Sequence, residues 1–207
     1  MADELVFYTN PMSRGRIVCW MIEEVGQPYR TELLDYGASM KGADYLAINP
    51  MGKVPAIRHG DTVVTEGAAI CAYLADAFPE AGLAAIDDRG AYYRWLFFAA
   101  GPVEQAIVNK SLGVVIPTEK KMMAGYGDFE DAMAGLEAAV AGKRYVAGDR
   151  FSAADVILGS QIGWGLMFGL IPDRPAFRDY WAGLVDRPAK KRADDIDNAL
   201  MPKPDIV

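Results

Sequence analysis

The sequence predicts a chain in two parts, a mixed α/β part followed by an all-helical part. Over roughly the first eighty residues, short apolar runs typical of strands alternate with apolar residues at helical spacing. Beyond residue 88 only the helical spacing recurs. A chain of 207 residues is long enough for two small domains with real cores.

The expected order in the first part is β-α-β-α-β-β-α. Gly26 ends the first helix, and His59-Gly60-Asp61 is the turn of a hairpin. A crossover helix between the first two strands implies that they pair in parallel, whereas the hairpin adds an antiparallel pair. The expected elements lie at residues 5–8, 13–25, 28–34, 41–48, 54–57, 62–64 and 66–78.

The second part begins after a segment without periodicity at residues 79–88, which we interpret as a linker. The sequence therefore divides into an α/β domain at 1–78, the linker, and a helical domain at 89–207. Gly101-Pro102 indicates a kink in the first long helix. The expected helices lie at residues 89–116, 117–141, 153–168, 174–186 and 188–200.

Composition excludes several classes of protein. The formal net charge of −7 argues against nucleic acid as a partner, because phosphate backbones are held by clustered Lys and Arg. No apolar run approaches the roughly 20 residues of a membrane span, and the acidic start is unlike a signal peptide, so we expect a cytoplasmic protein. With His59, Cys19 and Cys71 as the full set of His and Cys, a metal cofactor is not expected.

The pair Ser152 and Asp155 forms a predicted capping box at the start of one helix of the second part. The carboxylate of Asp155 is expected to accept from the N–H of Ser152, with Ser152 accepting in return. We interpret this pair as a folding element with no catalytic role.

A proline at the start of a central strand, as in Val54-Pro55, requires a reason, and one reason is a cis peptide bond. Residues 49–57 read Asn-Pro-Met-Gly-Lys-Val-Pro-Ala-Ile, and residues 66–70 read Glu-Gly-Ala-Ala-Ile. This combination resembles the glutathione transferase signature, in which NPxGxVP leads to a strand and then to E-S-x-A-I. The resemblance covers nearly the whole chain and is greatest to bacterial, serine-type or theta- and nu-like members.

The resemblance implies a thioredoxin-like N-terminal domain that binds glutathione and an all-helical domain that binds an apolar electrophile. It implies a cytosolic homodimer that conjugates glutathione as a detoxification enzyme. It also implies that glutathione is a substrate and that no metal takes part in the reaction.

The resemblance also assigns a glutathione site. It implies that the backbone of Val54, before Pro55, pairs with the cysteinyl unit, and that Lys53 meets the glycyl carboxylate. Glu66 and Gly67 stand at a helix start that favours the γ-glutamyl carboxylate. Gly67 departs from the family's serine, so one hydroxyl donor is absent.

The catalytic group must stabilise a thiolate, because an unperturbed thiol titrates near ~8.5 and is a poor nucleophile. Aligned on the family's first helix, Ser13 falls where serine-type classes keep the active group, although a role as helix cap alone is also open. Asn10 is the second choice. Tyr8 fits a strand interior better.

Two alternative functions remain open from the sequence. One is a glutathione-dependent peroxidase or disulfide reductase. The other is a non-catalytic glutathione-transferase-like binding protein, which the absence of the serine at Gly67 favours.

Overall fold

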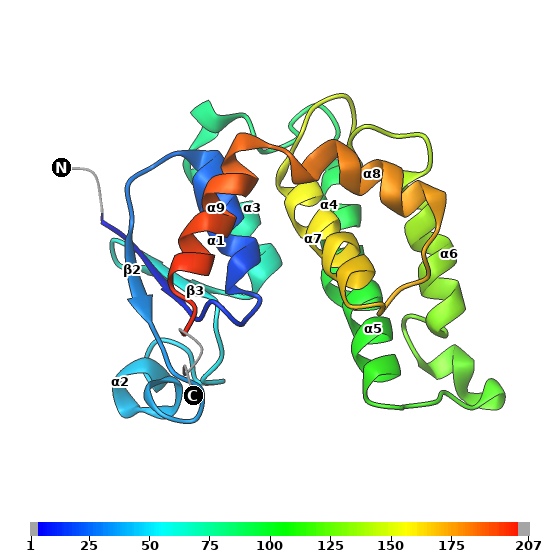
Figure 1. Cartoon of the computed structure of the whole chain (residues 1–207), viewed down its shortest axis with the longest axis horizontal. Helices are drawn as coiled ribbons and strands as arrows, with labels where there is room; N and C mark the ends of the chain where they lie inside the picture. Colours follow the sequence, from blue (N-terminus) through cyan, green and yellow to red (C-terminus); the bar gives the residue numbers. More distant parts are fainter. Residues whose placement is uncertain (1–3, 203–207) are drawn as a thin grey trace, which may run out of the picture. The chain divides into compact units, whose positions relative to one another are not determined.

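The computed structural model describes residues 4–202, which divide into two compact units (Figure 1). The first unit contains the chain up to Ala81 together with the residues from Arg187 onward, and the second contains Gly82–Asp186. The sequence placed residues 89–207 in one helical domain. The structure differs from this expectation in the last helix, which packs on the first unit.

The first unit is built on a four-stranded sheet in the order β2-β1-β3-β4. The central strand β1 (Leu5–Thr9) pairs in parallel with β2 (Arg30–Leu33) and antiparallel with β3 (Ala56–His59). The hairpin of β3 with β4 (Thr62–Thr65) is antiparallel. The parallel pair and the hairpin predicted from the sequence are both confirmed.

The helices of this unit bury apolar faces that the sequence pattern anticipates. They are α1 (Gly15–Val25), the short α2 (Ala43–Leu46) and α3 (Gly67–Ala77). Gly26 ends α1 in a left-handed conformation, as the C-cap rule predicts. The largest fully buried side chains of the sheet and helices are Phe7, Trp20, Met21, Ile22, Met40, Ile57, Ile70 and Leu74.

The last helix, α9 (Pro188–Ala199), lies beside α1 (Figure 1). Ion pairs join them: Arg187, just before α9, with Glu24 at 2.7 Å, Arg192 with Glu23 at 2.9 Å, and Asp194 with Arg16 at 3.8 Å. Small buried residues of α9, such as Ala189 and Ala193, allow the two backbones to approach closely.

Asp197 of α9 is buried, with 1% of its surface exposed, and lies beside the Cys19 thiol. Neither carboxylate oxygen accepts a hydrogen bond from a nitrogen or hydroxyl group of the described residues. Burial raises the pKa of Asp197 from its ordinary 3.8 to about 6, although the charge of Arg16 opposes the shift. Of the nearby groups on α9, Lys190 opposes it and Asp194 adds to it.

We expect Asp197→Asn to be more stable than the wild type at pH 7, by about 2 kcal/mol. A raised folded-state pKa means that the stabilising contribution of the protonated acid is complete below about pH 4 and is lost as the pH rises through about 6. The two proteins should therefore have equal stability near pH 4 and diverge above it. Urea unfolding at several pH values measures this, and parallel pH curves would contradict it.

The described residues of the second unit form helices and turns, with no strand among them. Its helices are α4 (Arg89–Phe98), α5 (Glu104–Ser111), α6 (Phe129–Val140), α7 (Ala153–Met167) and α8 (Pro175–Val185). A π-helical turn, Ala99–Val103, joins α4 to α5 at the predicted Gly101-Pro102 kink. Within residues 4–202, no helix combines the length and apolarity that a membrane crossing requires.

The helix predicted to begin at Pro117 begins only at Phe129, and this expectation is wrong. Thr118–Met123 instead forms 3₁₀ turns, and Gly127 has a positive φ of 72°. Asp128 then caps α6 by accepting from the N–H of Asp131 at 2.9 Å. Glycine and an N-cap residue mark a helix start, and here they outweigh the apolar spacing before them.

The predicted capping box at α7 is present and is completely buried. The carboxylate of Asp155 accepts from the N–H of Ser152 at 2.9 Å and from its hydroxyl at 3.1 Å. It also accepts from the N–H of Val146 at 2.7 Å and from the hydroxyl of Tyr180 at 2.6 Å. A single side chain therefore connects the start of α7, the preceding loop and α8.

Candidate functional site

Three loops leave the sheet of the first unit at one end. The strand register pairs Tyr8 with Ala56, and Ala56 with Thr65. Because β3 runs antiparallel to both β1 and β4, the chain after β1, the chain before β3 and the chain after β4 emerge at the same end of the sheet. All the candidate site residues lie in these three segments.

The loop after β1 is fixed by the side chain of Asn10. Its Nδ2 donates to the carbonyl of Leu34 at 2.8 Å, and its Oδ1 accepts from the N–H of Met12 at 2.9 Å. Asn10 is buried. Both ends of its amide are thus engaged with backbone, which is the arrangement of a residue that shapes a loop.

Ser13 is half-buried just before α1, and its hydroxyl is bonded on both sides. Its Oγ donates to the carbonyl of Asn10 at 2.6 Å and accepts from the N–H of Gly15 at 2.9 Å. The carbonyl of Asn10 also accepts from the N–H of Ser13 at 3.1 Å. The hydroxyl proton can therefore turn to another acceptor without leaving that carbonyl unpaired.

Gly15 is required by the close approach of α1 to β1. A Cβ at this position would lie 2.0 Å from Oγ1 of Thr9, which is buried. Any larger residue would push the first turn of α1, and Ser13 with it, away from the strand.

The peptide bond between Val54 and Pro55 is cis. Among residues 4–202, the backbone N–H and carbonyl of Val54 have no hydrogen-bond partner, and the residue is half-buried. Unpaired backbone groups just before a strand are able to pair with a bound extended peptide. Lys53 is exposed beside them.

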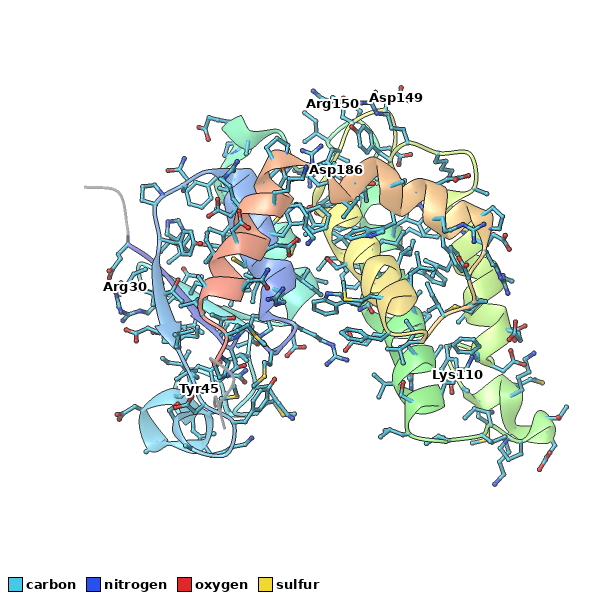
Figure 2. All side chains as sticks on the ribbon, in the orientation of Figure 1. Arg30, Tyr45, Lys110, Asp149, Arg150 and Asp186 are labelled. Atoms are coloured by element: carbon cyan, nitrogen blue, oxygen red, sulfur yellow. The ribbon has the colours of Figure 1, made fainter. Side chains whose placement is uncertain are left out.

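The loop before Val54 is positioned by three side chains that the sequence analysis did not assign. The hydroxyl of Tyr45 and the Nδ2 of Asn49 donate to the carbonyl of Lys53 at 2.6 and 2.8 Å (Tyr45 is labelled in Figure 2). Burial raises the pKa of Tyr45 to about 12, so its hydroxyl remains a donor. The Nζ of Lys41 donates to the carbonyls of Met51 and Gly52, both at 2.9 Å.

Of these three residues, Asn49 belongs to the quoted motif and could have been found from it. Tyr45 and Lys41 carried no sequence signal, because their partners are backbone carbonyls several residues away.

Glu66 and Gly67 lie at the start of α3, as predicted. Glu66 is the one non-glycine residue with a positive φ, 66°, in the described chain. Strained backbone of this kind is concentrated at ligand-binding positions. At Gly67 an added Cβ would meet no atom within 4 Å, so the space for a hydroxyl donor is open.

Other groups that could take part in thiol chemistry are buried. Burial raises the pKa of both Cys19 and Cys71, which keeps them as thiols. Tyr8 is buried against Tyr45, in agreement with the strand interior expected for it. In residues 4–202, no group of three or more His, Cys, Asp or Glu side chains could hold a metal.

The fold places the chain in the class of proteins that have a thioredoxin-like sheet domain followed by a helical domain. Residues 12–77 match the family described as the glutathione S-transferase N-terminal domain. Glutathione S-transferase F9 of Arabidopsis thaliana is 29% identical over 71% of this chain and 75% of its own length. Glutathione S-transferase A of Pleuronectes platessa is 26% identical over 86% of each.

Solved structures agree with these relatives. A sphingomonad glutathione S-transferase complexed with glutathione is 28% identical, with a TM-score of 0.74 over 93% of this chain and 98% of its own. A glutathione transferase of Methylococcus capsulatus is 28% identical, with a TM-score of 0.76 over 94% and 99%. In its N-terminal domain, its relatives and its fold, the chain is similar to glutathione S-transferases.

Proposed function

We propose that this protein is a glutathione transferase that conjugates glutathione to an apolar electrophile. The observation that carries the proposal is the unpaired backbone of Val54, at the end of the sheet where Ser13 and the start of α3 also lie. A tripeptide paired with Val54 would direct its cysteinyl sulfur along this end of the sheet, and its γ-glutamyl carboxylate toward the N–H groups of Gly67 and its neighbours.

Ser13 would stabilise the thiolate by redirecting its hydroxyl proton from the carbonyl of Asn10 to the sulfur. The bond that Oγ accepts from the N–H of Gly15 makes the hydroxyl a stronger donor. The thiol proton leaves to solvent, the sulfur forms a bond to carbon, and the leaving group departs with its electron pair. Hydrogen bonding to the charged form lowers the pKa of the bound thiol.

The second substrate would bind the helical unit, where large apolar side chains are exposed. Phe97 of α4 is 70% exposed and Phe168 is 66% exposed. Tyr92 and Trp95, also of α4, are buried in the core. We further propose a cytoplasmic homodimer, whose oligomeric state gel filtration measures.

Ser13→Ala should lower kcat with a chromogenic aryl halide by about 10- to 100-fold, because one hydrogen bond to a charged group contributes about 1.5–3 kcal/mol. The pKa in the pH profile of kcat/KM should rise by at least one unit, whereas glutathione affinity measured by calorimetry should change little. Ser111→Ala is the matched control, because its hydroxyl donates to the carbonyl of Ile107 in the helical unit.

An unchanged rate in Ser13→Ala, together with loss of the rate in Asn10→Ala, would transfer the catalytic role to Asn10. Glutathione binding without turnover of electrophiles, peroxides or small disulfides would instead support the non-catalytic alternative, which Gly67 favours. Turnover of peroxides or disulfides alone would support the peroxidase or reductase. The buried cysteines indicate that such a reductase would depend on glutathione sulfur.

A further inference from the structure

An open surface cavity of about 550 Å³ lies on the helical unit, apart from the residues assigned to glutathione, and the charged side chains that line it are exposed. It is lined by the start of α4 and by the loop that connects α6 to α7. Its volume is within the range of small-molecule sites. The lining residues with charged or aromatic side chains are Asp88, Arg94, Trp95, Lys143, Arg144 and Asp149.

The three cations of this cavity have no anionic partner. In the described chain, the side chains of Arg94, Lys143 and Arg144 form no ion pair or hydrogen bond. Four other cations of the unit pair with carboxylates, namely Lys121 with Asp128, Arg150 with Asp87, Arg174 with Glu137, and Arg178 with Asp173, whereas Lys110 and Lys120 form no ion pair among the described residues. In a chain with a net charge of −7, three unpaired cations in one cavity form a local exception.

Two of the cations are held against one fixed ring. The guanidinium of Arg94 lies 4.4 Å from the centroid of Trp95, and the Nζ of Lys143 lies 5.5 Å from it. Trp95 is buried, so the ring does not move freely. The two charges are therefore within about 10 Å of each other, near the Debye length at 0.1 M salt, and they repel.

The loop that carries Lys143 and Arg144 is anchored on both sides. The N–H of Lys143 donates to the carbonyl of Val140 at 3.0 Å, and the N–H of Val146 donates to the buried carboxylate of Asp155. The two cations are thus presented from a fixed backbone. A site whose donors are held in place before binding loses less entropy when a ligand arrives.

The carboxylates of the cavity do not cancel this charge. Asp88 caps α4, and its Oδ1 accepts from the N–H of Ala91 at 2.8 Å. Asp149 lies in the connection from α6 to α7, next to Arg150 (both are labelled in Figure 2). The cavity therefore has three cations and two carboxylates, and one of the carboxylates already accepts a hydrogen bond as a helix cap. The net charge of the site is positive.

We propose that this cavity binds a small molecule that carries a phosphate or sulfate group. Arg94 offers a planar fork that matches two oxygens of such a group, and Lys143 and Arg144 complete its neutralisation. A polyanion such as nucleic acid is disfavoured by the acidic remainder of the chain, whereas a compact anion responds mainly to the nearby charges. The site is independent of the proposed reaction.

The test is calorimetry of the full chain at low salt with inorganic phosphate, sulfate and phenyl phosphate. We expect saturable binding with a Kd of about 1 mM or tighter, weakened at least tenfold in the double variant Arg94→Gln with Lys143→Gln. Lys120→Gln is the matched control, because Lys120 is exposed on the same unit and forms no ion pair among residues 4–202.

The three probes distinguish the source of the anion. Phosphate and phenyl phosphate should bind more tightly at pH 8 than at pH 5, because both lose their second proton between these two pH values, whereas sulfate should bind equally at both. Tighter binding of phenyl phosphate than of phosphate would indicate an ester. Absence of saturable binding by all three probes, or equal weakening in Lys120→Gln, would overturn the proposal. Circular dichroism confirms that each variant is folded.

Discussion

Asp155→Ala is expected to lower the free energy of unfolding of the helical unit by about 4 kcal/mol. The carboxylate is fully buried and accepts hydrogen bonds from Ser152, Val146 and Tyr180. Removing it leaves the N–H of Val146 and the hydroxyl of Tyr180 without an acceptor in the core. Each buried donor left unpaired costs about 1–3 kcal/mol.

Urea unfolding followed by circular dichroism measures this loss. The matched control is Asp131→Ala, because Asp131 takes the same position in the capping box of α6 and is exposed to solvent. Water can replace the lost acceptor there, so the loss should be far smaller. Similar losses in the two variants would mean that Asp155 acts only as a helix cap, and that its bonds to Val146 and Tyr180 contribute nothing.

The capping box at Asp155 shows how far sequence reasoning reaches. The spacing of Ser152 and Asp155 predicted the local bond, because both partners lie in one helical turn. The bonds to Val146 and Tyr180 were not predictable, since they depend on where a loop and another helix pack. Hydrogen bonds within one helical turn can be predicted from residue spacing. Hydrogen bonds between segments far apart in the sequence depend on how those segments pack.

The candidate site divides in the same way. The positions of its loops follow from strand register, which the alternation of strand and helix signals allowed us to anticipate. The hydrogen bonds of Ser13, and the hydrogen bond from Tyr45 to the carbonyl of Lys53, could not be predicted from the sequence. His59, expected in the hairpin turn, is the last residue of β3 and is half-buried, with its Nδ1 at 3.0 Å from the hydroxyl oxygen of Tyr73.

The last helix is where the expected domain boundary and the structure differ most. Apolar and small residues at helical spacing predicted α9 but could not show which helix it would meet. The buried face of α9 includes Ala189, Ala193 and Asp197, a set with little apolar surface of its own. Its attachment to α1 must therefore depend strongly on the charged contacts.

Glu24→Ala should lower the free energy of unfolding of the first unit by about 3 kcal/mol and weaken the attachment of α9. The side chain of Glu24 is only 7% exposed, and it accepts from Nε and Nη2 of Arg187 at 2.7 and 2.8 Å. It also accepts from Nε1 of Trp20 at 2.8 Å. Removing it leaves a guanidinium and an indole N–H without this acceptor.

Hydrogen exchange of the α9 amides locates the effect, since protection should fall there while the helices of the second unit keep theirs. Arg192→Ala is the control, because this more exposed partner of Glu23 should contribute only about 0.5 kcal/mol. Unchanged protection of α9 in Glu24→Ala would mean that its small apolar face holds it without help. Reduced protection would mean that one bidentate ion pair, with partners 163 positions apart in sequence, is a principal attachment of the C-terminal helix to the first unit.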